Sequence, residues 1–275
     1  MAIAALIDGQ PVGDLNRVFA LDDRGLHYGD GLFETALLID GRVRFLDAHL
    51  DRLLHGCEVL GIHVPQRNVF ADEIDRVTHE LRSGVLKIIV TRGAGKRGYR
   101  PSANHQATRA IVLYPDNLDR SKTELRRVRL RWCGIRLGRN VQLAGLKHLN
   151  RLESVLAQSE WSDPSIEEGL MLDTEGEIVC GTATNVFAVK ENVLITPDLR
   201  FCGVRGIFRA QVLRAARELG ITAEEAPLWP QDLETATEVF LTNAVHGIRS
   251  VFALDELHWD EPVIAPQLAK LPQLL

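Results

Sequence analysis

The stretch LAGLKHLNRLESVLAQSEW, residues 143–161, places a lysine at a predicted junction between a loop and a helix. Lys147 follows a glycine-punctuated loop, residues 134–145, and precedes apolar residues at helical spacing. Asn150 and Glu153 have the spacing of a capping box, which predicts a helix that begins beside Asn150. A lysine between apolar neighbours at such a junction is partly desolvated, which lowers its pKa and frees its amine for imine formation.

Strands and helices are predicted on both sides of this stretch. Residues 32–39 and 43–46 are separated by Asp40-Gly41, the strongest short-range signal of a β-hairpin. Further strands are predicted at 3–7, 85–90, 108–114, 125–132, 169–172, 178–189, 193–195 and 238–242, with a final hairpin near 251–257. Helices are predicted at 47–60, 69–82 and 207–219. Mixed strands and helices of this kind indicate an α/β or α+β fold.

The expected domain boundary lies in the polar segment 115–122. It would separate a small N-terminal α/β domain, residues 1–117, from a larger C-terminal domain, residues 118–275. Lys147 is expected in the C-terminal domain. A chain of 275 residues is long enough for two such domains that each bury a core.

Composition and charge argue against several classes of protein. The chain is 45% hydrophobic and 25% charged, which is ordinary for a globular protein. Its formal net charge of −5 provides no attraction to nucleic acid or to an anionic membrane. No apolar run approaches the roughly 18 residues that span a bilayer, and the four cysteines lack the paired spacing of a metal site. We expect a reduced, cytoplasmic protein with no metal, nucleic-acid or membrane partner.

Several segments resemble one known family. Residues 143–161 resemble the lysine segment of the aminodeoxychorismate lyases, and DRGLHYGDGLFET (23–35), AHLDRL (48–53) and GTATNVF (181–187) resemble blocks shared by fold-type IV aminotransferases and lyases. GAGKRGY (93–99) and RLGRN (136–140) are similar to pieces more particular to the lyases. On the residues alone Lys147 is better explained as a solvated surface charge, and Lys87 is another candidate for a functional lysine. The resemblance implies a homodimer with pyridoxal 5'-phosphate between two domains.

The resemblance also implies roles for individual residues. Lys147 matches the lysine that holds the cofactor and then moves protons, and Arg52 matches the arginine that binds the cofactor phosphate, for which a planar guanidinium is suited. The backbone amides of Ile207 and Phe208, at a helix start, and the segment Asn243-Ala244 match the other phosphate contacts. Without the resemblance, Arg52 could be an ordinary residue of an amphipathic helix and Asn243 an ordinary turn residue.

Cys180 departs from the family pattern. Fold-type IV enzymes normally place a glutamate there, where its carboxylate pairs with the protonated pyridine nitrogen of the cofactor. A thiol forms only a weak hydrogen bond, so the ring nitrogen should be less protonated. Such a cofactor suits an elimination that ends in an aromatic ring better than it suits transamination. Alternatively, Cys180 is a small strand residue in a protein with reduced or lost activity.

The expected activity is a lyase that converts 4-amino-4-deoxychorismate to 4-aminobenzoate and pyruvate, in folate biosynthesis. Its substrate carries carboxylates, so basic and aromatic residues should bind it. The residues that we expect to bind the substrate are Tyr28, Phe33, Arg97, Tyr99 and Arg139. A D-amino acid or branched-chain aminotransferase on the same fold is the alternative enzyme, and a pyridoxal-phosphate binder with little or no activity is the alternative from another class.

Overall fold

The computed structural model describes the chain except residues 1–3, 14–18, 80, 117–124, 272–273 and 275. Contacts divide the chain into two compact units. The first unit contains residues up to 119 together with 146–150, and the second contains 120–145 and 151–275. Among the residues described, no helix is both long and apolar enough to cross a lipid bilayer.

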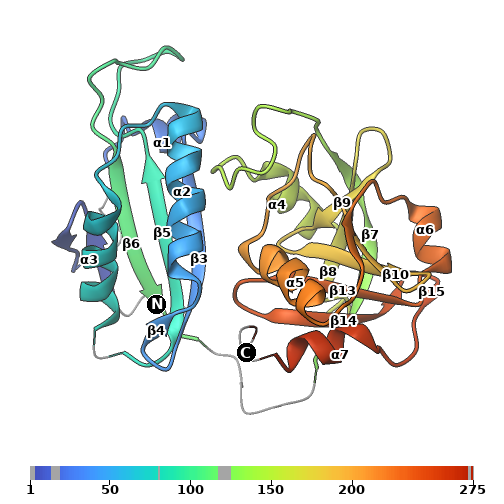
Figure 1. Ribbon diagram of the computed structural model, residues 1–275. Coiled ribbons are helices and arrows are strands. Elements are labelled where there is room, and N and C mark those ends of the chain that lie inside the picture. Colours follow the sequence, from blue (N-terminus) through green and yellow to red (C-terminus); the bar gives the residue numbers. More distant parts are fainter. Residues whose placement is uncertain (1–3, 14–18, 80, 117–124, 272–273, 275) are drawn as a thin grey trace. The chain divides into compact units, whose positions relative to one another are not determined.

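The first unit is an antiparallel sheet with helices on one face (Figure 1). Its strand order is β2-β1-β6-β5-β3-β4. The strands are β1 (Ala4–Ile7), β2 (Gln10–Pro11), β3 (Gly31–Ile39), β4 (Arg42–Val43), β5 (Gly84–Thr91) and β6 (Thr108–Tyr114), and the helices are α1 (Arg24–Tyr28), α2 (Leu46–Leu60) and α3 (Arg67–Thr78). Helix α2 packs on β3, and α3 packs on β1 and β6.

Alternation along the central strands gives the two faces of this sheet different characters. Leu32 of β3 packs against Gly56 of α2, so Leu32 and every second residue after it face the helices. Phe33 lies on the opposite face, where β3 and β5 keep part of their side-chain surface exposed. Register places Lys87 of β5 beside Thr35 on that same open face.

The second unit is a larger mixed sheet with strand order β12-β11-β10-β13-β14-β7-β8-β9, and β15 pairs with β14. The strands are β7 (Arg127–Leu137), β8 (Glu168–Asp173), β9 (Ile178–Gly181), β10 (Asn185–Lys190), β11 (Val193–Thr196), β12 (Ala223–Glu225), β13 (Glu238–Asn243), β14 (Gly247–Leu254) and β15 (Leu257–His258), and the helices are α4 (Leu152–Gln158), α5 (Ile207–Glu218), α6 (Pro230–Thr235) and α7 (Ile264–Ala269). Strand β7 is parallel to both β14 and β8. Phe187 and Phe240 stack at 4.9 Å between ring centres within its core.

Two local predictions are wrong for identifiable reasons. Residues 178–189 form two strands, β9 and β10, because the backbone of Thr182 leaves the ladder and donates to the buried carboxylate of Glu168 at 3.1 Å. The capping box is absent because the side chain of Asn150 is used elsewhere: its Nδ2 donates to the carbonyl of Gly29 at 3.2 Å. Helix α4 therefore begins at Leu152 without a side-chain cap.

The lysine segment also differs from the expected domain division. Residues 147–149 pair with residues 31–33 at the start of β3: the amide of Phe33 donates to the carbonyl of Lys147 at 2.9 Å, and that of Leu149 to Gly31 at 3.0 Å. These bonds assign Leu146–Asn150 to the first unit, although residues on both sides belong to the second.

Candidate functional site

Lys147 is held in place by its backbone, while its side chain remains half-buried. Its ammonium nitrogen lies 4.3 Å from the centre of the Phe33 ring, a cation–π contact on the open face of the first sheet. The nitrogen of Lys87 lies 5.5 Å from the same ring. The ring of Phe33 is thus within cation–π distance of both Lys147, the predicted cofactor lysine, and Lys87.

Arg52 on α2 is fixed by a buried carboxylate. Its Nε donates to one oxygen of Glu34 at 2.7 Å and its Nη2 to the other at 2.6 Å. The Nδ1 of His49, also on α2, lies 2.7 Å from Glu34. Burial alone would raise the pKa of Glu34, but the bonds from His49 and Arg52 outweigh it and lower that pKa to about 2. Glu34 is therefore ionised, and it orients the planar guanidinium of Arg52.

Arg97 and Tyr99 lie in the long loop between β5 and β6, and Tyr28 of α1 contacts this loop. The hydroxyl of Tyr28 accepts a hydrogen bond from the amide of Gly98 at 3.1 Å, and the rings of Tyr28 and Tyr99 lie 5.4 Å apart. Tyr99 is 85% exposed and Arg97 is also exposed. The predicted substrate residues of the first unit thus comprise Phe33 on the sheet and three residues at this loop.

Cys180 is half-buried on β9 and packs against a cluster that includes Cys133 and Cys202. Burial, followed by the neighbouring thiol of Cys202, raises the pKa of Cys180 to about 12. At neutral pH its side chain is therefore an uncharged thiol. The glutamate nearest in sequence, Glu177, is bound to Arg139 at 3.0 Å.

The start of α5 offers backbone amides rather than side chains. Gly206 precedes the helix without a side-chain cap, and a Cβ at that position would meet the side-chain oxygen of Asn185 at 2.0 Å. The first turn of a helix carries N–H groups that the helix itself does not use, which suits an anion. Phe208 is 1% exposed with its ring in the core, so only its backbone and that of Ile207 are suited to a ligand.

The turn after β13 is organised by Asn243. Its side-chain oxygen accepts from the amides of Val245 at 3.1 Å and His246 at 2.7 Å. Asn243 therefore shapes the backbone around Ala244. Beside it, the hydroxyl of Thr242 is buried and has no hydrogen-bond partner within the described part of the chain. A buried polar atom of this kind is rare and is typical of a position that a ligand or water completes.

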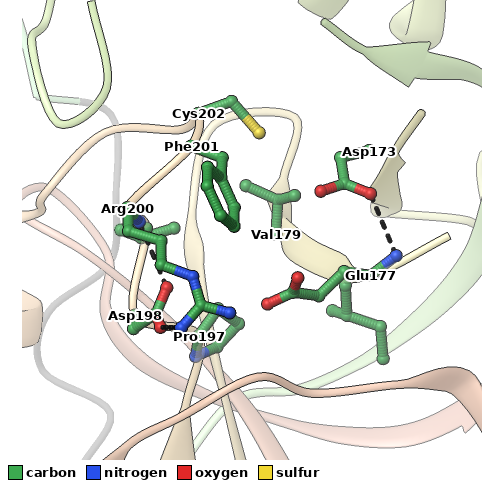
Figure 2. A pocket seen from close by; sticks show the side chains of 10 residues that line it. Asp173, Glu177, Val179, Pro197, Asp198, Arg200, Phe201 and Cys202 are labelled. Atoms are coloured by element: carbon green, nitrogen blue, oxygen red, sulfur yellow. Dashed lines mark hydrogen bonds and ion pairs between the residues drawn. The ribbon is translucent and has the colours of Figure 1, made fainter. Parts of the chain in front are cut away.

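Arg139 forms salt bridges with the carboxylates of Asp173 and Glu177. Its Nε donates to Asp173 at 2.6 Å, and its guanidinium lies 4.4 Å from the Phe201 ring. Asp173, Glu177 and Phe201 also line a hollow of about 10 Å³, shown in Figure 2. That volume accommodates about one water molecule, so this hollow is not a cofactor site.

Three features of the site were not predicted from the sequence. Glu34 lies in the segment DRGLHYGDGLFET (23–35), but nothing in this segment indicates that Glu34 binds Arg52. The unpartnered hydroxyl of Thr242 depends on the packing around it. Arg24 contacts residues more than seventy positions away. All three features depend on residues that are distant in sequence, and local patterns carry no information about them.

Residues 31–254 of the chain match the family described as amino-transferase class IV. A putative branched-chain-amino-acid aminotransferase from Methanocaldococcus jannaschii is 34% identical over 90% of this chain and 87% of its own length. The aminodeoxychorismate lyase of Vibrio harveyi is 32% identical over 84% of this chain and 85% of its own length.

Solved structures agree with this assignment. The 4-amino-4-deoxychorismate lyase of Pseudomonas aeruginosa superposes with a TM-score of 0.88 and 41% identity, and the match covers 96% of each chain. The resemblance stated from the sequence motifs and the predicted fold-type IV class are both confirmed.

Proposed function

The chain belongs to the amino-transferase class IV family, and from this premise we propose that it is a lyase that converts 4-amino-4-deoxychorismate to 4-aminobenzoate and pyruvate. The observation that carries the proposal is the 41% identity to the Pseudomonas aeruginosa lyase over nearly the whole of both chains. The lyase-like segments 93–99 and 136–140 support the same choice. We further propose that it acts as a homodimer in the cytoplasm, as the resemblance implies.

Enzymes of this family depend on pyridoxal phosphate, and we propose how this chain would hold it. Lys147 would bind the cofactor through its amine, and Arg52 would bind the phosphate. The amides of Ile207 and Phe208 and the turn Asn243-Ala244 would complete the phosphate site. The donor set fits an anion, because Arg52 is already oriented and the buried hydroxyl of Thr242 has no partner among the residues described.

Cys180, the residue proposed to face the pyridine nitrogen of the cofactor, fits that nitrogen less well than a glutamate would. A carboxylate would hold a proton on that nitrogen, whereas Cys180 is a neutral thiol with a pKa of about 12. When bound, the cofactor supplies an electron sink for bonds next to the amine-bearing carbon. We propose that Cys180 makes this sink weaker. Loss of a good leaving group, followed by formation of an aromatic ring, depends least on a strong electron sink.

Lys147 would also act as the general base. Once the substrate amine has replaced it, its own amine can remove the proton from the amine-bearing carbon, provided that it is neutral at that moment. Phe33 restricts the directions in which the amine can point, since it covers one side of it at 4.3 Å. Arg97 and Tyr99 would bind substrate carboxylate, and we keep Arg139 as a weaker candidate because Asp173 and Glu177 already neutralise it.

An aminotransferase is the second candidate, and the Methanocaldococcus jannaschii relative favours it. It would use the same Lys147 and Arg52 but would have to return a proton to the cofactor-derived carbon, for which a strong electron sink is needed. Cys180 argues against an efficient aminotransferase. It also leaves open the third candidate, a cofactor binder with reduced activity.

The test is to supply purified protein, loaded with pyridoxal phosphate, with three substrates in parallel: 4-amino-4-deoxychorismate, D-alanine with 2-oxoglutarate, and leucine with 2-oxoglutarate. We expect 4-aminobenzoate and pyruvate in equal amounts from the first, at a rate at least about a hundredfold above the other two, a difference of about 2.7 kcal/mol in activation energy. New amino acid without 4-aminobenzoate would establish the aminotransferase instead, and no product from any substrate would favour the binder.

Lys147→Ala should abolish both the visible absorbance of the bound cofactor and turnover, with a loss of at least about a thousandfold in kcat. Lys270→Ala, at an exposed lysine that ends α7, is the matched control and should leave both unchanged. Retained absorbance in Lys147→Ala would mean that another lysine, Lys87 first, holds the cofactor.

A further inference from the structure

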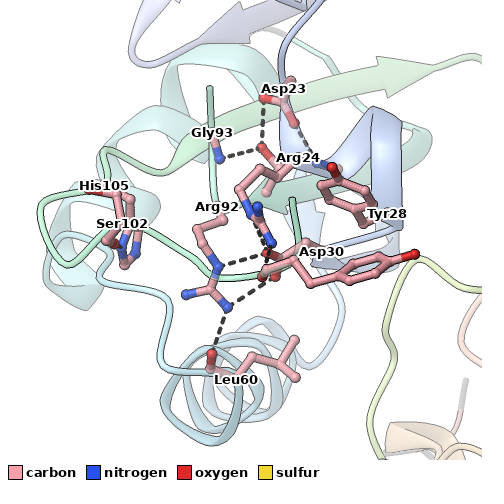
Figure 3. Close-up of polar contacts among 12 residues, drawn as sticks. Asp23, Arg24, Tyr28, Asp30, Leu60, Arg92, Gly93, Ser102 and His105 are labelled. Atoms are coloured by element: carbon pink, nitrogen blue, oxygen red, sulfur yellow. Dashed lines mark hydrogen bonds and ion pairs between the residues drawn. The ribbon is translucent and has the colours of Figure 1, made fainter. Parts of the chain in front are cut away.

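Arg24 binds the backbone of the loop that carries Arg97 and Tyr99. It opens α1 and is only 5% exposed, and Figure 3 shows its guanidinium beside Asp30. All three of its guanidinium nitrogens donate hydrogen bonds. Nη1 donates to the carbonyl of Gly98 and Nη2 to that of Tyr99, each at 2.8 Å. Nε donates to Asp30 at 2.8 Å. The two carbonyls directly after Arg97 are therefore pinned by one side chain.

The position of Arg24 is itself fixed on several sides. Its amide donates to the carbonyl of Gly93 at 2.9 Å, at the beginning of the loop. Asp23 caps α1 by accepting from the amide of Gly25 at 2.7 Å and is bound by the hydroxyl of Thr91 at 2.9 Å. The guanidinium of Arg24 also lies 4.9 Å from the Tyr28 ring. A side chain with this many constraints loses little further entropy when it binds the loop.

Arg92 shares Asp30 with Arg24 but serves a different segment. It donates to Asp30 through Nε at 2.8 Å and through Nη2 at 3.0 Å. Its remaining bonds go to the carbonyls of Leu60 and Gly61, at the end of α2, each at 2.7 Å. Asp30 therefore binds two arginines that contact different segments. Arg24 binds the loop carbonyls of Gly98 and Tyr99, whereas Arg92 binds the end of α2.

The segment that begins with Arg24 also binds the lysine segment. Residues 31–33 pair with 147–149, and the side-chain Nδ2 of Asn150 donates to the carbonyl of Gly29. Residues 24–33 thus connect on one side to Lys147 and on the other to the loop with Arg97 and Tyr99. Since Lys96, Arg97 and Arg100 are all exposed, mutual repulsion would favour a spread loop without this restraint.

We propose that Arg24 is a positioning residue, which holds the loop 93–100 so that Arg97 and Tyr99 can bind a carboxylate of the substrate. The inference rests on the proposed function only in requiring a substrate with a carboxylate, and this holds for the lyase and the aminotransferase alike. Arg24 does not contact the substrate itself, so its loss should affect binding more than the chemical step.

The first readout does not depend on turnover. Trypsin cleaves after Lys96 and Arg97, whereas Pro101 blocks cleavage after Arg100. We expect the cofactor-loaded Arg24→Gln variant to be cut after Lys96 and Arg97 about tenfold faster than the natural protein, because local opening then costs less. Arg92→Gln removes the other arginine on Asp30 and should raise cleavage there by less than about twofold. Arg82→Gln, in an exposed pair with Asp40, should not change it.

The second readout separates positioning from a general loss of structure. With whichever substrate the enzyme turns over, Arg24→Gln should raise KM about tenfold while kcat stays within about twofold. Arg24→Lys should recover part of KM, because an ammonium can reach one carbonyl but not two and Asp30 together. If no substrate turns over, binding of 4-aminobenzoate, measured by calorimetry, replaces KM, so failure of the proposed activity does not decide this test.

Three results would overturn the inference. One is equal cleavage at Lys96 and Arg97 in Arg24→Gln and in the natural protein. Another is an equal increase in Arg92→Gln, since the effect would then belong to Asp30 and not to the carbonyl contacts. The last is a fall in kcat with unchanged KM. Should Arg24→Gln fail to fold, Arg24→Lys tests the same restraint by both readouts. Tyr28→Phe, which removes the acceptor for the amide of Gly98, tests it by tryptic cleavage alone.

Discussion

Glu34 in the first unit and Cys180 in the second are both ionisable side chains on strands, yet their surroundings shift their pKa values in opposite directions. The pKa of Glu34 is lowered to about 2 because, despite burial, His49 and Arg52 bind both of its oxygens. The pKa of Cys180 is raised to about 12 because it is buried beside other thiols and apolar side chains. Burial alone therefore does not decide whether a side chain is charged. The hydrogen-bond and ion-pair partners around it do.

The difference also bears on the proposed cofactor site. In the first unit, the buried carboxylate of Glu34 orients the guanidinium of Arg52, the residue proposed to bind the phosphate. In the second unit, Cys180 is a neutral thiol at the position where the resemblance implies a carboxylate. Neither side chain should change its charge over the physiological pH range: Glu34 stays ionised until the pH falls well below 4.5, and Cys180 stays neutral.

The largest effect on this comparison should come from Arg52→Met. It removes the main cation from a carboxylate that is 1% exposed, and breaking a buried pair in this way costs about 3 kcal/mol in the free energy of unfolding. Urea unfolding at a fixed cofactor concentration measures it. Arg67→Met, whose pairs with Asp47 and Asp51 are exposed, is the control and should cost less than about 1 kcal/mol. Equal losses would mean that Glu34 is held mainly by His49.

The next effect concerns acid stability. Since the pKa of Glu34 is about 2 in the folded protein and 4.5 is its ordinary value, the unfolded chain binds more protons between these values. The stabilisation is complete above pH 4.5 and is lost as the pH falls toward 2, by on the order of 3 kcal/mol. Glu34→Gln should remove this part of the slope when the free energy of unfolding is measured against pH. An unchanged slope would assign the acid sensitivity to other carboxylates.

The smallest effect should come from Cys180→Glu. A carboxylate there should protonate the ring nitrogen, raise transfer of the amino group about tenfold and make the visible spectrum of the cofactor depend on pH below neutrality. Cys180→Ser, which keeps a neutral side chain of similar size, is the matched control and should leave the spectrum as it is. Identical spectra and rates for natural protein and Cys180→Glu would show that position 180 does not contact the ring.

Much of the fold could be predicted from local pattern. The hairpin at Asp40-Gly41 forms with both residues at positive φ, 50° and 76°, as an Asp-Gly turn requires. Helix α2 ends at Gly61, whose φ of 63° closes the helix with backbone bonds. These elements are decided by residues next to one another, so the sequence suffices for them.

The errors and omissions arise where distant partners decide. Asn150 has the right spacing for a cap but binds Gly29, and Glu153 accepts from the amide of Gly138 at 2.9 Å instead of closing the helix. Lys147 and Arg52 were selected by resemblance to a family, and the contacts that orient them, from Phe33 and Glu34, became visible only in three dimensions. The pairing of Arg24 with the loop at 98–99 has no local signal at all.

The path of the chain through residues 146–150 has a consequence for biosynthesis. A ribosome releases residues 1–119 first, but the pairing of 147–149 with 31–33 cannot form until this later segment has emerged. The N-terminal unit is therefore completed only after the second unit has begun to be made, so vectorial folding cannot finish one unit before starting the next. A nascent chain arrested at residue 119 would lack residues 147–149, so residues 31–33 of β3 would pair with β5 on one edge but would lack this segment on the other.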